Sequence, residues 1–388
     1  MAVYLLATLD TKGPEATFVR DRLVEFDVAV ELVDVSCGSR AGDRGQAVNA
    51  AAASAAHLVR EAFDQGKVQG VLALGGSAGT TVGTAAMRTL PIGVPKLMIS
   101  TLASGQVRPW VGDKDILMLN SVVDIAGINR ISRIVLTEAA AAMAGMVKST
   151  SHSPPRSSHF DRPLIAATMF GVTTPCVQHA RKILEAAGYE VIVFHATGNG
   201  GQAMESLIRE GMFAAVLDIT TTELADELVG GILSAGPTRL TAAAEMGIPQ
   251  VVSVGALDMV NFGPRETIPP KFADRKFHVH NASVTLMRTT PEENRKLGEE
   301  ICRKLAAAHG PVSILLPLKG ISTIDRPDQP FDDSIAREAL YNAIRHHDGD
   351  VELLEFDAHI NDEAFAAAAA AKLLELIGTK AHATDLTH

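Results

Sequence analysis

Cysteine is scarce in this 388-residue sequence, which has only Cys37, Cys176 and Cys302. The three residues lie far apart and match neither a disulfide framework nor the spacing of a zinc site. We therefore interpret them as small buried side chains of a protein in a reducing compartment. No metal site is assigned from cysteine.

Long apolar runs are absent as well. No window approaches eighteen consecutive apolar residues, so no transmembrane helix and no membrane partner are expected. The apolar stretch 1–8 meets Asp10 and Lys12 at once and lacks a basic start, so it does not fit a secretory signal. The sequence therefore predicts a cytoplasmic protein.

Clusters of lysine and arginine are also missing, and the formal net charge is -10. Binding to nucleic acid depends on basic side chains gathered against phosphates. We therefore expect no nucleic-acid partner, although a local basic pocket for a small anion stays open.

What the sequence does contain is one apolar pattern that occurs twice. A strand-like run at 3–9 is followed by a helix with Val19, Leu23 and Phe26 on one face, and the same order restarts at 164–169. The stretch between the halves is rich in Ser, Pro and His and has no apolar period. We predict a first domain over 1–150, a linker over 151–160 and a second domain over 161–388.

Alternating strands and helices indicate an α/β fold with parallel sheets. We predict two Rossmann-like domains, each an open, mostly parallel sheet with helices on both faces. A closed (β/α)₈ barrel is the alternative, but the linker and the restarted pattern favour two open sheets. The polar stretch 261–281 is predicted to be a long loop at a cleft.

The informative polar residues come directly after predicted strands. In open parallel sheets this carboxyl edge binds ligands, and two such domains would bind a ligand in the cleft between them. The glycine-rich run 75–81 follows the apolar stretch 71–74 and precedes a helix. This layout presents backbone N–H groups to an anion, so it predicts a phosphate site. Packing alone also produces such turns, and neither standard nucleotide motif is matched.

Lys12 supplies the cation that the glycine motif lacks, while Ser77, Thr80 and Ser104 offer hydroxyl groups. A solvated lysine and hydroxyls that cap helix ends fit the same residues. The predicted ligand-binding set is Asp10, Thr11, Lys12, Gly75, Gly76, Ser77, Gly79, Thr80, Thr81, Thr101 and Ser104. A second glycine turn at 198–201 is another candidate for anion binding.

The second half carries the candidates for acid–base chemistry, which are His195, Asp218, Asp258, His278 and His280. The aspartates could equally cap turns, and the histidines could form hydrogen bonds in a polar cleft. The two histidines at 278 and 280 suggest a metal site without specifying one. No nucleophile elbow and no Ser-His-Asp order is visible.

Five runs, at 7–12, 74–81, 121–129, 195–205 and 277–281, together resemble one family. It is an uncharacterised bacterial and plant family that includes the ATP-binding, inhibitory amino-terminal region of the tomato mosaic virus resistance protein. The resemblance implies two Rossmann-like domains, ATP or ADP as ligand with Mg²⁺ as an optional companion, and a homodimer. Ala78 stands where the family motif usually has Gly, which narrows the freedom of the turn.

Three hypotheses about function follow. The first is a nucleotide-binding protein that holds phosphates at the 75–81 turn. The second is a metabolic enzyme that acts on a small anionic substrate with the histidines and aspartates of the second domain. The third is an interaction or regulatory module whose nucleotide sets its conformation.

Overall fold

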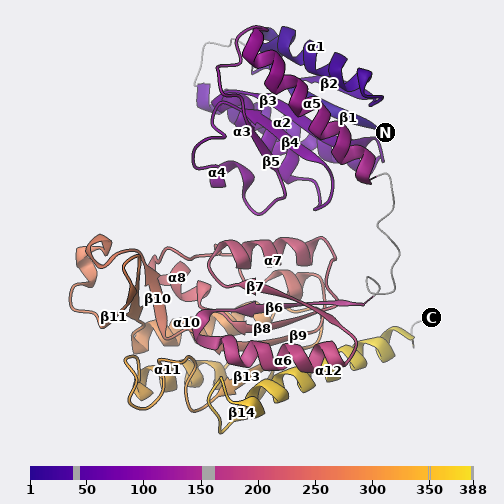
Figure 1. The fold of residues 1–388 in the computed structure, drawn as a ribbon. Coiled ribbons are helices and arrows are strands. Elements are labelled where there is room, and N and C mark those ends of the chain that lie inside the picture. Colours follow the sequence, from indigo (N-terminus) through magenta and orange to yellow (C-terminus); the bar gives the residue numbers. More distant parts are fainter. Residues whose placement is uncertain (38–43, 151–161, 348, 350, 386–388) are drawn as a thin grey trace. The chain divides into compact units, whose positions relative to one another are not determined.

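The computed structural model describes residues 1–37, 44–150, 162–347, 349 and 351–385. The chain divides into two compact units, Met1–Ser157 and Ser158–His388, and each is described by itself (Figure 1). The predicted linker, 151–160, lies outside the described residues. Of the described helices, none is both long and apolar enough to cross a membrane.

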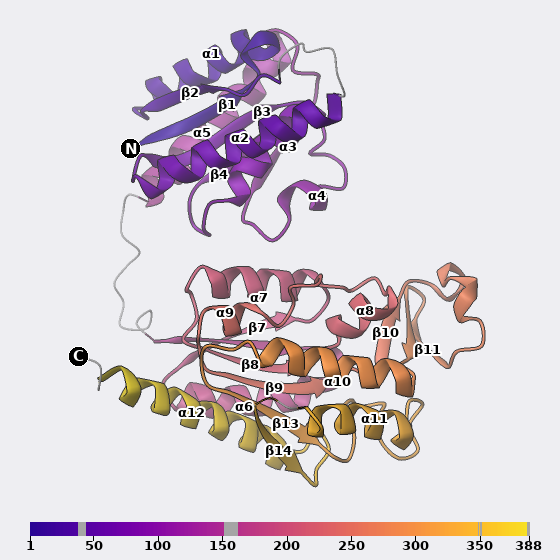
Figure 2. The ribbon, with the colours of Figure 1, turned by 180° about the vertical axis from the view of Figure 1, so that it is seen from behind.

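The first unit is a five-stranded parallel sheet with the strand order β2-β1-β3-β4-β5. Helices α1 and α5 cover one face of this sheet, and α2 and α3 cover the other (Figure 1 and Figure 2). Its elements are β1 (Ala2–Ala7), α1 (Leu9–Glu25), β2 (Val30–Asp34), α2 (Arg44–Asp64), β3 (Val68–Gly75), α3 (Ser77–Arg88), β4 (Lys96–Ser100), α4 (Arg108–Val111), β5 (Leu117–Asn120) and α5 (Arg130–Thr150).

Both faces of the first sheet are apolar, which explains why its strands read as continuous runs rather than as an alternating pattern. Leu5 and Leu72 face α1 and α5, whereas Leu6 and Ala73 face α2 and α3. Each helix packs on the sheet through one apolar stripe, because its apolar residues recur every three or four positions.

The second unit is a six-stranded parallel sheet in the order β14-β13-β9-β8-β6-β7. Helices α6 and α12 share a core on one face, and α7 to α11 pack on the other. Its elements are β6 (Leu164–Met169), η1 (Gly171–Thr173), α6 (Thr174–Ala186), β7 (Glu190–His195), α7 (Asn199–Arg209), β8 (Ala215–Thr220), α8 (Glu223–Val229), α9 (Ala242–Glu245), β9 (Gln250–Gly255), β10 (Met259–Phe262), η2 (Arg265–Thr267), η3 (Pro270–Phe272), β11 (Phe277–Asn281), β12 (Val284–Arg288), α10 (Pro291–Leu305), β13 (Val312–Pro317), α11 (Ser334–Arg345), β14 (Glu352–Phe356) and α12 (Glu363–Asp385).

The predicted fold class of two Rossmann-like domains is confirmed. In both units the first strand of the sheet lies between the second and the third. The chain therefore adds its second strand on one side of the first and its third strand on the other side. Ligands of such sheets bind at this switch point, outside the carboxyl ends of the two strands. The switch point lies between β1 and β3 in the first unit and between β6 and β8 in the second.

The stretch 261–281, predicted as one polar loop, contains more regular structure than expected. Its first two residues end β10, and its last five form β11, which pairs with β12 in a separate three-stranded antiparallel sheet. The alternation of Phe277 and Val279 with His278 and His280 is a strand pattern. This strand was not predicted from the sequence, because most of the residues around it are polar.

Candidate functional site

The glycine turn of the first unit joins β3 to α3. Gly75 ends the strand, and a β-carbon added to it would lie 2.8 Å from the Cα atom of Gly79. A β-carbon on Gly79 would lie 3.2 Å from the carbonyl oxygen of Leu74. These two glycines are therefore explained by the close approach of strand and helix, which is the packing reason that the sequence left open.

Gly76 has no such explanation. Its φ of −81° suits any residue, and an added β-carbon would meet only the Thr101 hydroxyl oxygen, at 3.7 Å. The next three N–H groups, of Ser77, Ala78 and Gly79, have no acceptor among the residues that the structure describes. The Ser77 side chain is exposed. The first turn of α3 thus presents open N–H groups at the positive end of a helix dipole.

Two predicted phosphate ligands are already engaged in holding this turn. The Thr80 side chain is buried, and its Oγ1 donates to Gly76 O at 2.8 Å and lies 2.7 Å from Ser100 Oγ. Thr81 Oγ1 donates to Ser77 O at 3.0 Å and accepts from Trp110 Nε1 at 3.4 Å. These hydroxyls link α3 to β4 and α4, so they hold the first turns of α3 in place rather than facing a ligand.

A polar pocket of about 420 Å³ lies at the carboxyl ends of β4 and β5. It is lined by Thr101, Ser104, Asn120, Ser121, Val122, Val123 and Asp124. Thr101 belongs both to this pocket and to the surroundings of Gly76, so the pocket adjoins the open turn of α3. The structure thereby brings together two stretches that were predicted separately, after β3 and after β4.

The pocket wall contains a strained residue. Val122 has a φ of 63° and is 67% exposed. A β-branched residue rarely adopts this left-handed conformation, which costs of order 1–3 kcal/mol and persists only where the surroundings impose it. Such strain concentrates at ligand sites, which supports a functional role for the stretch after β5.

The predicted residues after β1 lie at the start of α1. Asp10 is exposed, and its N–H donates to Ser36 Oγ at 3.3 Å, while the hydroxyls of Thr11 and Thr8 are 2.9 Å apart. Lys12 interrupts the helical backbone, with φ −125° and ψ 17°, and its Nζ donates to the carbonyl oxygen of Ile125. Ile125 directly follows the pocket residue Asp124, so the lysine is held beside the pocket wall.

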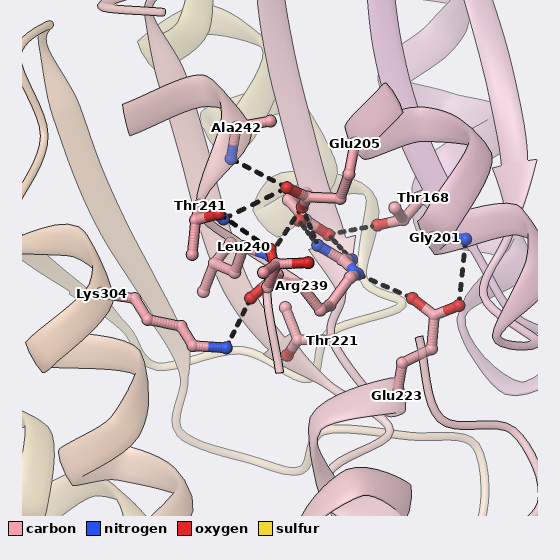
Figure 3. A network of polar contacts seen from close by, with 12 residues as sticks. Thr168, Gly201, Glu205, Thr221, Glu223, Arg239, Leu240, Thr241, Ala242 and Lys304 are labelled. Carbon is pink, nitrogen blue, oxygen red and sulfur yellow. Dashed lines mark hydrogen bonds and ion pairs between the residues drawn. The ribbon is translucent and has the colours of Figure 1, made fainter. Parts of the chain in front are cut away.

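The second predicted anion turn, 198–201, already contains an anion, which is the carboxylate of Glu223. Its Oε1 accepts from the N–H of Gly198 at 2.6 Å and from the N–H of Gly201 at 3.0 Å, and Figure 3 shows the contact with Gly201. A β-carbon on Gly201 would lie 2.2 Å from this carboxylate. The glycine-rich sequence is therefore required by an internal side chain, and the turn is closed to an external phosphate.

Asp218, predicted as an acid or base, belongs to the same buried network. Arg239 is fully buried and binds the Asp218 carboxylate with two nitrogens, at 2.6 and 2.7 Å. It also binds Glu223 at 2.7 Å, as Figure 3 shows. Thr168 donates to Asp218 at 2.7 Å, and Glu205 lies 3.4 Å from the guanidinium. Burial raises the pKa of Glu223, which Arg239 opposes. This network fills the switch point between β6 and β8.

Asp258 is buried elsewhere in the unit. Ser322 Oγ donates to one carboxylate oxygen at 2.8 Å, while the other oxygen has no hydrogen-bond partner within the described ranges. Burial, followed by the charge of Asp325, raises the pKa of Asp258. Asp325 itself binds Arg337 at 2.7 Å and Arg288 at 3.3 Å. The hydrogen bond between Ser322 and Asp258 thus links the segment after β13 to the segment after β9.

Among the described residues, the predicted histidines His195 and His278 make ring contacts with phenylalanines rather than contacts with Asp218 or Asp258. His195 ends β7, where its ring stacks on Phe170 with centroids 5.4 Å apart, and His278 contacts Phe331 edge-on from β11. Between any two of the five predicted catalytic residues, the described structure shows no hydrogen bond, ion pair or ring contact. The described residues also contain no group of three His, Cys, Asp or Glu that could hold a metal ion.

Comparison with known proteins shows which family the chain belongs to. The model of the uncharacterised protein family UPF0261 matches the chain in two parts, its N-terminal domain at residues 37–152 and its C-terminal domain at 162–377. The chain belongs to the UPF0261 family. A UPF0261 protein of Clostridium tetani is 46% identical over 402 residues, which cover 97% of this chain and 98% of that protein.

Another relative of this UPF0261 chain is the tomato (Solanum lycopersicum) ToMV resistance protein Tm-1(GCR237). It is 40% identical over 426 residues, which cover 98% of this chain but only 56% of the tomato protein. Among solved structures, a UDP-N-acetylglucosamine 2-epimerase from Rickettsia bellii aligns with 97% of this chain at 11% identity and a TM-score of 0.21. That similarity supports no statement about function.

Some residues of this UPF0261 chain that matter for the sites were not predicted. Asn120 and the following pocket residues carry a usable signal, since they follow a predicted strand as the other candidates do. Arg239 and its partners Glu205 and Glu223 carry none. An arginine inside a mostly apolar stretch does not reveal which distant carboxylates it binds.

Proposed function

We propose that the first unit binds ATP or ADP, with the phosphates at the first turn of α3. The observation that carries the proposal is the set of three N–H groups beside Gly76 that have no acceptor among the described residues, at a position where a β-carbon on Gly76 would also fit. Helix amino ends of this kind suit phosphates, because the N–H groups and the helix dipole both favour negative charge.

The contrast between the two switch points favours the first unit. In the second unit, Arg239 and its carboxylates occupy that position and are buried. In the first unit, the equivalent edge has an open helix terminus next to a polar pocket. Of the two carboxyl edges, only that of the first unit is thus proposed to accept a ligand.

The composition of the pocket suits the uncharged part of a nucleotide. Hydroxyl and carboxamide groups of Thr101, Ser104 and Asn120 line it beside the Asp124 carboxylate, and no basic side chain of the described residues does. Such groups bind ribose hydroxyls and base edges, while the phosphates take the N–H groups of α3. Lys12, held at the neighbouring Ile125, adds a positive charge for them.

Isothermal titration calorimetry with ATP, ADP and adenosine tests the proposal directly. Fluorescence gives a second readout, because Trp110 is the only tryptophan of the chain and its indole contacts Thr81 in the first two turns of α3. We expect ATP and ADP to bind more tightly than adenosine. A wild-type protein that binds neither nucleotide would overturn the proposal.

The variant Gly76→Asp locates the site. Aspartate is a favoured residue before a helix, so the fold should persist, but its carboxylate would repel phosphate at close range. We expect roughly 100-fold weaker ATP binding. Gly145→Asp is the matched control, because it adds the same charge on α5, where nothing lies within 4 Å of the new β-carbon. Equal affinity of the two variants for ATP would show that the phosphates bind elsewhere.

A further inference from the structure

We propose that Glu15 positions Lys12 for the phosphates through the short segment 125–127. The inference rests on the proposed nucleotide site and concerns a residue that affects the site without contacting the ligand. Lys12 and Glu15 are one turn apart on α1, and both contact this segment. Lys12 Nζ donates to Ile125 O, and Glu15 Oε1 accepts from the N–H of Gly127.

The two ends of the stretch between β5 and α5 are fixed independently of α1. At one end, Ser121 N donates to Ser100 O at 3.2 Å. At the other, the N–H of Asn129 donates to Ser132 Oγ at 2.8 Å, and Asn129 Oδ1 caps the start of α5. Between these anchors, the N–H groups of 124–126 and 128 have no acceptor in the described structure. The middle of the stretch therefore depends on Glu15, Lys12, the buried Ile125 side chain and Ser132, whose Oγ donates to Gly127 O at 3.2 Å.

Glu15 is poorly placed for stability alone. It is 1% exposed, its Oε1 has the Gly127 partner, and its Oε2 is buried without any partner among the described residues. A half-satisfied buried carboxylate destabilises a fold. A residue that breaks this rule beside a ligand site is a candidate for a functional role.

The consequence for Lys12 is preorganisation. An ammonium group has three donors, and Ile125 O takes one, which leaves the others for phosphate oxygens. A lysine that is already held loses less side-chain entropy when a ligand arrives. If the segment moves, the amine loses its anchor even though its charge is unchanged. Glu15 thereby influences phosphate binding without touching the ligand.

A double-mutant cycle with Lys12→Met and Glu15→Met tests this coupling. Methionine fills the buried volume of Glu15 without an acceptor, so the fold is retained where alanine would leave a cavity. We expect Glu15→Met to weaken ATP binding about tenfold and to leave adenosine binding unchanged, because only the phosphate contact is affected. In the Lys12→Met background the same change should have no further effect.

Glu15→Gln is the conservative control, since its carbonyl oxygen still accepts from Gly127, and it should restore the wild-type preference of ATP over adenosine. Melting temperatures of all variants separate this effect from loss of folding. Additive losses in the cycle, or equal losses for ATP and adenosine, would overturn the role of Glu15. Absence of ATP binding to the wild type would instead defeat the proposed function.

Discussion

Asp226 is a buried carboxylate that only accepts hydrogen bonds. It receives the N–H groups of Leu233 and Asn261, both at 3.1 Å, and the Asn261 amide nitrogen at 2.7 Å. Burial raises its pKa to about 7, despite these donors. The Oδ1 atom of Asn261 is buried and has no partner within the described residues. A rotated Asn261 amide would therefore find a donor in a protonated Asp226.

We predict that Asp226→Asn makes the protein less sensitive to pH. The folded pKa of about 7 exceeds the unfolded value of about 3.9, so the folded state binds more protons between them. The stabilising contribution is complete below pH 4 and is lost as the pH rises through 7. Between pH 5.5 and 8 the wild type should lose about 2 kcal/mol that the variant keeps.

Urea unfolding at the two pH values measures this difference. Glu227→Gln, which removes a neighbouring exposed carboxylate, is the control and should follow the wild type. Parallel pH curves for wild type and Asp226→Asn would contradict the raised pKa.

At the residue scale, the sequence identified chemically capable groups but not their partners. Asp218 was predicted as an acid or base, and the structure pairs it with Arg239, 21 residues further along. Asp10, Lys12, Thr101 and Ser104 do lie at the predicted sheet edge, because their position after a strand is a local property. Which side chains neutralise one another depends on long-range packing, which one sequence does not contain.

At the element scale, two glycine-rich turns look alike in sequence and differ in use. The turn before α3 has open N–H groups, whereas the turn before α7 binds the Glu223 carboxylate. The sequence predicted an anion at both. The difference comes from α8, whose first residue is Glu223, and no local pattern around 198–201 indicates that a carboxylate arrives from there.

We predict that Arg239→Met severely destabilises the second unit. The substitution leaves Asp218 and Glu223 buried without their cation, which typically costs about 3–5 kcal/mol. Arg181→Met is the matched control, because Arg181 binds Glu185 at 2.6 Å on the surface of α6 and such pairs contribute about 1 kcal/mol or less. Chemical denaturation monitored by circular dichroism gives both values. Equally small losses would show that the network is dispensable.

At the scale of the whole molecule, each unit has its own sheet and its own buried cores. The fold class was predictable, because alternating strand and helix patterns leave few architectures. The strand order was not, since it depends on which strands pair across long stretches of chain. The shared position of the first strand, between the second and third, appears only in the structure.

We predict that ATP protects the two units unequally in hydrogen–deuterium exchange. A ligand at 100 times its Kd stabilises the state that binds it by about 2.7 kcal/mol. Amides of β3 and β4 that exchange through unfolding of the first unit should slow about 100-fold, and those of β8 and β9 should not change. Gly76→Asp, which should bind ATP about 100-fold more weakly and so lose most of this protection, is the control. Equal slowing in both units would mean that they unfold together.

The position of α12 has a consequence for synthesis on the ribosome. Phe365, Ala366 and Ala369 of this helix share a core with Ile165 of β6, the first strand of the second unit. The helix α6, which follows β6 directly, already covers part of this face, but the part over β8 and β9 stays uncovered until α12 emerges, roughly 200 residues after the first unit ends. At usual rates of elongation the delay is roughly 10–40 s. The first unit can fold while the chain is still growing, whereas the nascent second unit exposes an apolar sheet that chaperones would recognise.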